Sequence, residues 1–244
     1  ARLLASLHIV MGHLHAKGAV EDVYCFGWGF TWVPWFFMLS GYVNTHARQH
    51  SSKPDKVDAP LAFLAKRAAP IAPLYALALL LALLLRLAQH RTLPPWWVLA
   101  SQGVLAQAWL PWLTERSLQA HCWFLSCMVL YWLLFPSLYR LTRTLSLSTV
   151  TTALLLSFLP PWLFAIVPAA SGGGVAENWF QAHRTGSYST SLDLWVVTLK
   201  FSPVCYLHVF LSGMLLARWR FLVKERLERE EEGRERAEGR KEEE

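Results

Sequence analysis

The chain has 244 residues, of which 54% are hydrophobic, and its formal net charge is +6. Ten of the 17 acidic residues fall in residues 224–244, so the rest of the chain holds 16 basic against 7 acidic residues, a net charge of +9. Apolar blocks of about 20 residues are typical of membrane spans, and a basic excess in such a protein sets its topology. The sequence has no basic stripe interleaved with aromatic residues on a soluble fold, which argues against nucleic-acid binding.

In chain order, the apolar blocks predict an all-α fold, a polytopic bundle of about six transmembrane helices. The spans are predicted near residues 3–16, 25–45, 70–87, 121–139, 147–167 and 194–219. We expect Pro34 to kink the second span, and Ser40 and Gly41 to let another backbone approach it closely. We interpret the polar residues 46–67 as a loop. The four cysteines show no metal-binding or CxxC spacing and are predicted to be free thiols.

Both ends of the chain carry information about its organisation. The first span is short for a bilayer and the chain begins at Ala1 without a methionine, so we expect a fragment or a domain of a longer protein. The last residues are a mixed-charge run of high helix propensity. We therefore predict a transmembrane domain, residues 1–222, followed by a charged helical or disordered tail, residues 223–244.

One apolar segment, residues 94–113, is ambiguous because it carries a serine and two glutamines and has prolines at both ends. The distribution of charge decides its placement. If the basic loop 46–67 is cytoplasmic and residues 94–113 cross the membrane, Arg140, Arg143 and the basic start of the tail all fall outside. If the segment re-enters the membrane or lies at its interface, both basic clusters return to the cytoplasm. We therefore predict a non-crossing segment and two cytoplasmic termini.

The first span carries one arginine and three histidines, and ionisable groups on a spanning helix indicate function by default. Arg2 and His13 are eleven residues apart. That is nearly three helical turns, so both lie on one face, about 16 Å apart along the axis. The structural alternative is a histidine that packs against a neighbouring helix. His8 and His15 share a different face, and we interpret them as packing or interface residues.

Five short motifs resemble, in order and spacing, those of the acyltransferase-3 family of integral-membrane O-acyltransferases. They are the Arg2–His13 spacing, FFMLSGY (36–42), KRAAPIAPLY (66–75), WFLSCMVLYWLLFP (123–136) and YLHVFLSGMLLAR (206–218). The resemblance implies a ten-span protein that moves an acyl group, often acetyl from acetyl-CoA, onto a hydroxyl of a sugar or another acceptor. It implies the bilayer, acyl-CoA and a hydroxyl-bearing acceptor as partners, with no bound cofactor or metal. The acceptor, the membrane and the oligomeric state are not indicated.

Acyl transfer to a hydroxyl needs a base that takes the hydroxyl proton as the oxygen attacks the thioester. Histidine has a suitable pKa, and partial burial keeps the ring neutral. His13 is therefore the predicted catalytic base, and it stands at the position of the family's motif histidine. Arg2, at the cytoplasmic end of the same helix, is predicted to bind an anionic part of the donor or to orient the site. Alternatively, Arg2 is an ordinary basic residue at the cytoplasmic end of a transmembrane helix.

Coenzyme A carries several phosphates, so its site should be basic and open to the cytoplasm. Lys66 and Arg67, at the mouth of the third span, are the predicted acyl-CoA-binding residues. Charges that only set topology are the alternative. The resemblance adds Trp123 and Ser126 to this site.

The chain departs from the family pattern in three places. Pro70 stands where members commonly carry a second arginine, and Met128 stands where many carry a glutamate, so no predicted span holds an acidic residue. The family's last spans are absent, and the charged tail stands in their place. The sequence therefore also allows a degenerate or truncated member that acts as a membrane interaction protein. A transporter fragment is a further alternative, but it predicts internal repeats, and the sequence shows none that convince.

Overall fold

The computed structural model describes residues 2–16, 18–20, 24–54, 56–114, 116–160 and 197–243. Regular secondary structure in this part of the chain is entirely helical, as the sequence predicts. In chain order the elements are α1 (Arg2–Ala16), the 3-10 helix η1 (Tyr24–Thr31), α2 (Trp32–Gln49), α3 (Pro60–Ala68), α4 (Ala72–Ala88), α5 (Trp96–Gly103), α6 (Pro111–Thr114), the 3-10 helix η2 (Ala120–Cys122), α7 (Trp123–Thr142), α8 (Leu147–Leu156) and α12 (Pro203–Glu243).

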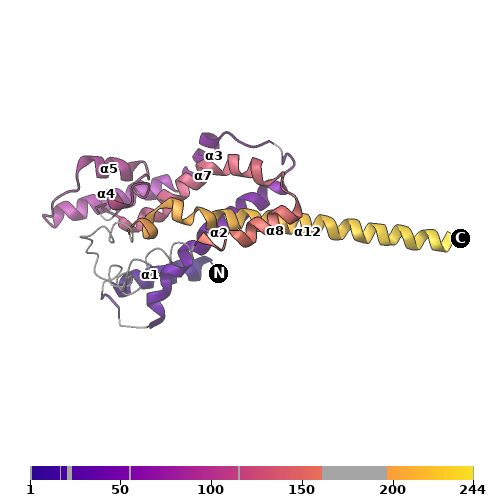
Figure 1. Ribbon diagram of the computed structural model, residues 1–244. Helices are drawn as coiled ribbons and strands as arrows, with labels where there is room; N and C mark the ends of the chain where they lie inside the picture. Colours follow the sequence, from indigo (N-terminus) through magenta and orange to yellow (C-terminus); the bar gives the residue numbers. More distant parts are fainter. Residues whose placement is uncertain are drawn as a thin grey trace.

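Helices α2 and α12 cross at the centre of the molecule (Figure 1). Helices α7 and α8 both pack against α12, and α3 packs against α7. Helices α4 and α5 extend toward one end of the molecule, while the charged half of α12 projects from the opposite end (Figure 1). Helix α1 contacts mainly η1. The fold therefore has a packed centre and a peripheral first helix.

Two glycines bring the backbones of α2 and α12 into contact. A Cβ atom added at Gly41 of α2 would collide with the carbonyl group of Phe210, and one added at Gly213 of α12 would collide with the carbonyl group of Met38. Small residues of this kind allow membrane helices to cross closely. The LSG stretches of the two helices therefore face each other, although they are far apart in sequence.

Aromatic rings fill the space around this crossing. Phe37 of α2 is fully buried and meets the ring of Tyr131 of α7 edge-on, with the ring centroids 5.2 Å apart. Phe135 stacks on Phe63 of α3 at 4.7 Å. The Tyr131 hydroxyl donates a hydrogen bond of 2.6 Å to the Pro203 carbonyl oxygen, which joins α7 to the beginning of α12. Edge-on and offset ring pairs add about 0.5–1.5 kcal/mol each beyond their burial.

The prediction for the second span is wrong at its start. Residues 24–31 form the 3-10 helix η1, and α2 begins only at Trp32. Pro34 therefore lies in the first turn of α2. A proline there costs no intrahelical hydrogen bond, because the first N–H groups of a helix have no partner within it. It marks the beginning of a helix and does not kink its middle.

The prediction of a loop over residues 46–67 is wrong at both ends. Helix α2 continues to Gln49, and α3 begins at Pro60. The polar composition of the stretch hid one apolar contact: Phe63 is 5% exposed and stacks on α7. Tertiary packing of this kind stabilises a short helix that its own propensity would not.

Helices α3 and α4 form a pair bent by 63°, and Pro70 lies in the break between them. Proline cannot donate the N–H that would continue α3, and its ring crowds the preceding turn. The chain closes the bend with a tight turn, in which the Ile71 N–H donates to the Ala68 carbonyl oxygen at 2.9 Å. Pro70 thus has a structural role at the position where the family motif has an arginine.

Within the segment 94–113 the structure holds only short helices, α5 and α6. Helix α5 has eight residues, about 12 Å, against a hydrocarbon core of about 30 Å. Buried polar contacts fix the segment to the protein. The Tyr75 hydroxyl donates to the Gln102 carbonyl oxygen at 2.7 Å, and the Gln102 side-chain oxygen accepts from the Leu118 N–H at 2.9 Å.

Two helical stretches of the described residues are long and apolar enough to cross a membrane, Ala120–Thr142 and Val197–Glu238, and the bent pair α3–α4 makes a third if it counts as one span. The predicted number of six spans is therefore not established. Residues 161–167 of the predicted fifth span and residues 194–196 of the predicted sixth lie outside the described residues.

The charged tail continues α12 without a break to Glu243. Ion pairs four residues apart run along it, such as that between Arg226 Nε and Glu230 Oε1 at 2.8 Å. Each exposed pair of this kind contributes only about 0.3–0.5 kcal/mol. The predicted domain boundary at residue 222 falls inside this helix, so the tail is an extension of the last span.

Candidate active site

His13 lies in the last turn of α1, exposed to solvent. Its ring faces that of His121 in η2, with the centroids 6.1 Å apart and the planes tilted by 58°. His121 is exposed as well and lies in η2, two residues before α7 begins. Two imidazoles from distant parts of the chain therefore meet at one accessible point. Histidine is the side chain best suited to move protons near neutral pH.

His8, on another face of α1, is a structural residue. Its Nδ1 accepts a hydrogen bond of 2.9 Å from the indole N–H of Trp32, which leaves the proton on Nε2. That Nε2 lies 2.6 Å from the carbonyl oxygen of Cys25, the acceptor it needs. His8 therefore joins α1 to η1 and to the beginning of α2, in agreement with the packing role that the sequence favoured.

Two glycines complete this attachment. A Cβ added at Gly12 of α1 would lie 2.8 Å from the carbonyl oxygen of Phe26, and one added at Gly29 of η1 would lie 2.7 Å from the carbonyl oxygen of His8. Neither position accepts a larger residue without a shift of the backbone. The turn of α1 that precedes His13 is therefore set against η1 at backbone contact.

Arg2 stands at the opposite end of α1 from His13 and is exposed. The eleven-residue separation corresponds to about 16 Å along the helix, so the two side chains cannot touch. Any joint role requires a ligand long enough to reach both. The roles predicted for His13 and Arg2 stay predictions.

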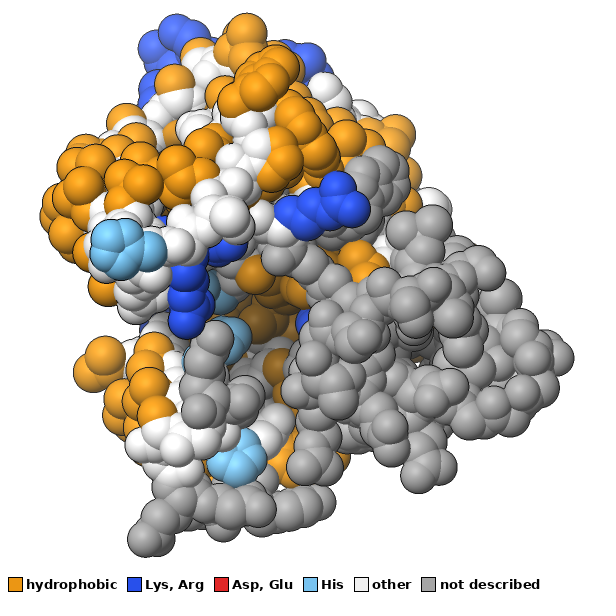
Figure 2. All heavy atoms as spheres, turned by 90° about the vertical axis from the view of Figure 1, so that its left-hand side faces the viewer, with side chains coloured by type: hydrophobic (Ala, Val, Ile, Leu, Met, Phe, Trp, Pro, Cys, Tyr) orange, Lys and Arg blue, Asp and Glu red, His pale blue; other side chains and the backbone are white. Residues whose placement is uncertain are grey.

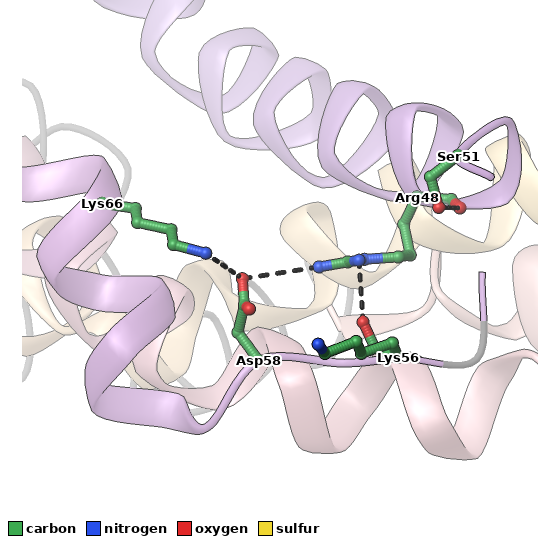
Figure 3. Close-up of polar contacts among 5 residues, drawn as sticks. All are labelled: Arg48, Ser51, Lys56, Asp58 and Lys66. Carbon is green, nitrogen blue, oxygen red and sulfur yellow. Dashed lines mark hydrogen bonds and ion pairs between the residues drawn. The ribbon is translucent and has the colours of Figure 1, made fainter. Parts of the chain in front are cut away.

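Lys66 and Arg67 lie in the last turn of α3. The Lys66 side chain points toward the carboxylate of Asp58 (Figure 3). Lys66 Nζ donates to Asp58 Oδ2 at 3.1 Å, and Arg48 of α2 reaches the same oxygen at 3.5 Å. Arg48 also donates to the Lys56 carbonyl oxygen at 2.8 Å. We call Arg48, Lys66 and Arg67, with Asp58 between them, the basic mouth.

Arg67 does not share this carboxylate. Its guanidinium lies over the ring of Phe63, 5.3 Å from the centroid. A guanidinium held over a ring keeps its donors at the edge of its plane, where an anion can bind in bidentate fashion. The basic mouth therefore retains two positive charges in excess after Asp58 is neutralised.

Trp123 and Ser126 have packing contacts. The buried Ser126 hydroxyl accepts a hydrogen bond of 3.0 Å from the Ala108 N–H, and the Ser126 carbonyl oxygen accepts one of 3.1 Å from the Trp109 indole. The Trp123 ring packs against that of Tyr206, with the centroids 5.3 Å apart. Ser126 thus ties the segment 94–113 to α7. Their predicted contact with acyl-CoA is untested.

Ser40 and Gly41 lie where α2 meets α12. Gly41 makes the backbone contact with Phe210, and the Ser40 hydroxyl accepts a hydrogen bond of 3.3 Å from the Asn44 side-chain amide. Neither residue offers a reactive group to the histidine pair. The LSG motif therefore positions helices.

Figure 2 views the molecule from the end toward which α1 runs. Histidine and basic side chains gather there around a hollow whose floor is hydrophobic (Figure 2). No acidic side chain of the described residues is visible on this face (Figure 2). An anionic or electron-rich substrate group would therefore meet a positive surface.

Met128, at the family's glutamate position, is 3% exposed and belongs to the hydrophobic core. A carboxylate at this place would be buried among aromatic rings, at a high cost in desolvation. The hydrophobic surroundings of position 128 therefore suit a methionine side chain better than the glutamate that the family resemblance implies there.

A separate cavity of about 620 Å³ lies between α4, α5 and α7. Its walls are leucine, valine, alanine and other apolar side chains, with Tyr75 as the single ionisable residue. The Tyr75 hydroxyl is already engaged by Gln102. This cavity offers space for apolar chains but no group that could act as a base.

The sequence did not indicate two residues of these clusters. His121 was treated only as the start of a span, although it stands two residues before the WFLSC motif. Arg48 lies within the stretch 46–67 that the sequence predicts as a loop, whereas the structure places it on the last turn of α2. The position of His121 next to a motif is the one sequence signal that could have indicated it. The ion pair of Arg48 with Asp58 depends on how the chain folds back after α2.

Apolar helices of spanning length are typical of an integral membrane protein, and the His13–His121 pair and the basic mouth are its candidate functional groups. Within the described ranges, no group of three or more side chains could hold a metal ion.

The comparison with protein families identifies the group more closely. The model of the acyltransferase-3 family, described as an acyltransferase domain, matches residues 1–229. The chain therefore belongs to the acyltransferase-3 family and is an integral membrane protein, as the five motifs indicated. Searches among curated proteins and among solved structures gave no match.

Proposed function

We propose that this protein transfers an acyl group, acetyl in the simplest case, from acyl-CoA to a hydroxyl of a carbohydrate or another acceptor. The observation that carries the proposal is the accessible His13–His121 pair, in a chain that matches the acyltransferase family over residues 1–229. His13 stands at the motif position and is open to a substrate.

In the proposed reaction His13 takes the proton of the acceptor hydroxyl as its oxygen attacks the thioester carbon. The C–O bond forms, the C–S bond breaks, and the proton passes from His13 to the leaving coenzyme A thiolate. His121 then stabilises or positions the charged ring, as a second imidazole within reach. No redox change and no covalent enzyme intermediate are needed.

The basic mouth is the proposed site for the phosphates of the donor. Arg48, Lys66 and Arg67 supply cations, and charge-assisted contacts to phosphate are the strong ones. Coenzyme A is long, with its phosphates at one end and its thioester at the other, so the two ends can occupy separate sites. Arg2 would contact an intermediate part of the donor or orient α1.

The topology that goes with this function has six spans, with residues 94–113 not crossing and both termini in the cytoplasm. The basic mouth then opens to the cytoplasm, where acyl-CoA is found. Single cysteines placed in residues 51–54 and in the tail should react with an impermeant reagent only from the cytoplasmic side. Reaction from the outside at either place would overturn the topology.

The decisive experiment is His13→Ala in the purified full chain with radiolabelled acetyl-CoA. We expect transfer and background hydrolysis to fall by about 10²–10⁴-fold, the usual contribution of a general base. His15→Ala, two residues along the same helix, is the matched control and should retain most turnover. Turnover by His13→Ala equal to that of the control would refute the assignment.

A second candidate function is favoured by Met128 and Pro70. Both residues have structural roles at positions where family members carry charged groups. A member without those groups could serve as a membrane interaction protein and no longer catalyse. Absence of labelled transfer or hydrolysis by the unaltered protein, with coenzyme A binding retained, would favour this second function.

A further inference from the structure

A second cationic cluster lies where α2 ends against α12. Tyr42, His46 and His50 follow one another at intervals of four residues, so they share one face of α2. The Tyr42 and His46 rings stack with centroids 5.8 Å apart, and those of His46 and His50 lie 4.2 Å apart. We call these three residues, with Arg220 of α12, the histidine–arginine cluster.

Arg220 is held in place by this face. Its Nη1 donates a hydrogen bond of 2.8 Å to the Tyr42 hydroxyl, and the next residue, Phe221, meets the His50 ring edge-on at 6.1 Å. The guanidinium and the His50 ring are nevertheless exposed. The donors are therefore positioned by the protein and accessible to a ligand.

In the part of the chain that the structure describes, no carboxylate pairs with this cluster as Asp58 does with the basic mouth. None of the ion pairs formed by the described residues involves Arg220. Partial burial, the charge of His50 and the charge of Arg220, in that order, lower the pKa of His46. Like-charged groups that gather without a counter-charge repel one another, and a bound anion relieves that repulsion.

We propose that the histidine–arginine cluster binds a phosphomonoester group. The guanidinium fork suits a phosphate. The His46 ring can donate a further hydrogen bond to its oxygens, and His50, whose Nδ1 already lies 2.9 Å from the His46 carbonyl oxygen, can donate one from Nε2 as an imidazolium. Two sources carry this group at the cytoplasmic membrane surface: the 3′-phosphate of coenzyme A and the headgroup of phosphatidic acid. The first source rests on the proposed acyl-CoA donor, and the second does not.

The test uses the full chain and two pairs of probes. Coenzyme A is compared with dephospho-coenzyme A by calorimetry in detergent. Phosphatidic acid is compared with phosphatidylcholine by native mass spectrometry of protein released from nanodiscs. We expect Arg220→Gln to weaken the binding of either coenzyme A or phosphatidic acid about tenfold, and to leave the binding of the matching compound without a phosphomonoester unchanged. His46→Gln combined with His50→Gln should weaken it about threefold.

Two further variants separate binding from folding. Tyr42→Phe keeps the packing of the ring but releases Arg220, and should weaken binding by a few fold with unchanged thermal stability. Lys224→Gln removes a cation from the next turn of α12 and should change the affinity by less than about twofold, because Lys224 already pairs with Glu228.

The outcomes are distinct. Sensitivity to Arg220→Gln in the coenzyme pair alone assigns the site to the donor, and sensitivity in the lipid pair alone assigns it to a headgroup. Equal affinities of Arg220→Gln and Lys224→Gln for all four probes overturn the inference. The proposed enzymatic function is judged separately by His13→Ala, which leaves this cluster unchanged.

Discussion

Helices α2 and α12 cross in the packed centre of the molecule, whereas α1 lies at its edge and packs mainly against η1. Phe37, Phe210 and Met214 at the crossing are fully buried. On α1, by contrast, Leu3 is 80% exposed and Leu4 is 70% exposed. Dense packing fixes the centre of the molecule, whereas the two hydrogen bonds of His8 orient the helix that carries His13.

Because local stability follows local contact density, we expect α1 to open more readily than the packed centre. The lipid bilayer can cover the exposed leucines of α1. Four substitutions test this contrast between the packed centre of the molecule and the attachment of α1.

The largest effect is expected from Gly213→Leu. Its side chain would collide with the backbone of Met38, which cannot move away as a flexible side chain can. Overpacking usually costs about 1–3 kcal/mol, and a backbone collision should exceed that range. We expect no monodisperse protein on size-exclusion chromatography. Gly233→Leu on the same helix has open space around it and should elute normally; similar behaviour of the two variants would contradict the crossing.

Phe37→Ala should destabilise the protein by about 3–5 kcal/mol, because it empties a fully buried site among four aromatic rings. Chemical denaturation in detergent, followed by tryptophan fluorescence, measures the change. Leu4→Ala is the matched removal of an apolar side chain on α1 and should cost less than about 0.5 kcal/mol. Equal losses at Phe37 and Leu4 would show that α1 belongs to the packed centre.

Ser126→Ala should cost about 1–3 kcal/mol, because the buried Ala108 N–H loses its acceptor. The same denaturation experiment measures it, with the exposed Thr152→Ala as control. Coenzyme A binding should stay within about twofold, the small change expected when a substitution lies away from the ligand. A loss of binding with unchanged stability would instead support the predicted contact of Ser126 with acyl-CoA.

His8→Ala should have the smallest effect on global stability, about 1 kcal/mol, because it removes two partly exposed hydrogen bonds. Its effect should be concentrated in α1. Hydrogen exchange is expected to rise in α1 and to stay unchanged in α12, and turnover should fall because His13 loses its fixed orientation. Unchanged exchange in α1 would show that glycine packing against η1 suffices to hold the helix.

Hydrophobic periodicity and length were enough to predict several elements. Helices α1, α4 and α7 begin and end within about three residues of their predicted positions, since long apolar blocks have few alternatives. Residues 60–68 and 24–31 differ from their predictions because neither is a long apolar block whose pattern specifies one structure. The first is a short helix that one phenylalanine holds in place, and the second is a glycine-containing 3-10 helix packed against α1.

The sequence by itself determined the class of protein, the all-helical fold and the placement of His13 on the first helix, because composition and motif spacing are local properties of the chain. Only the tertiary structure brought His121 to His13, Asp58 between Arg48 and Lys66, and Gly41 against Phe210. These contacts join residues that are distant in sequence, or that meet only after the chain turns back. They depend on how helices cross, and no local pattern encodes a crossing.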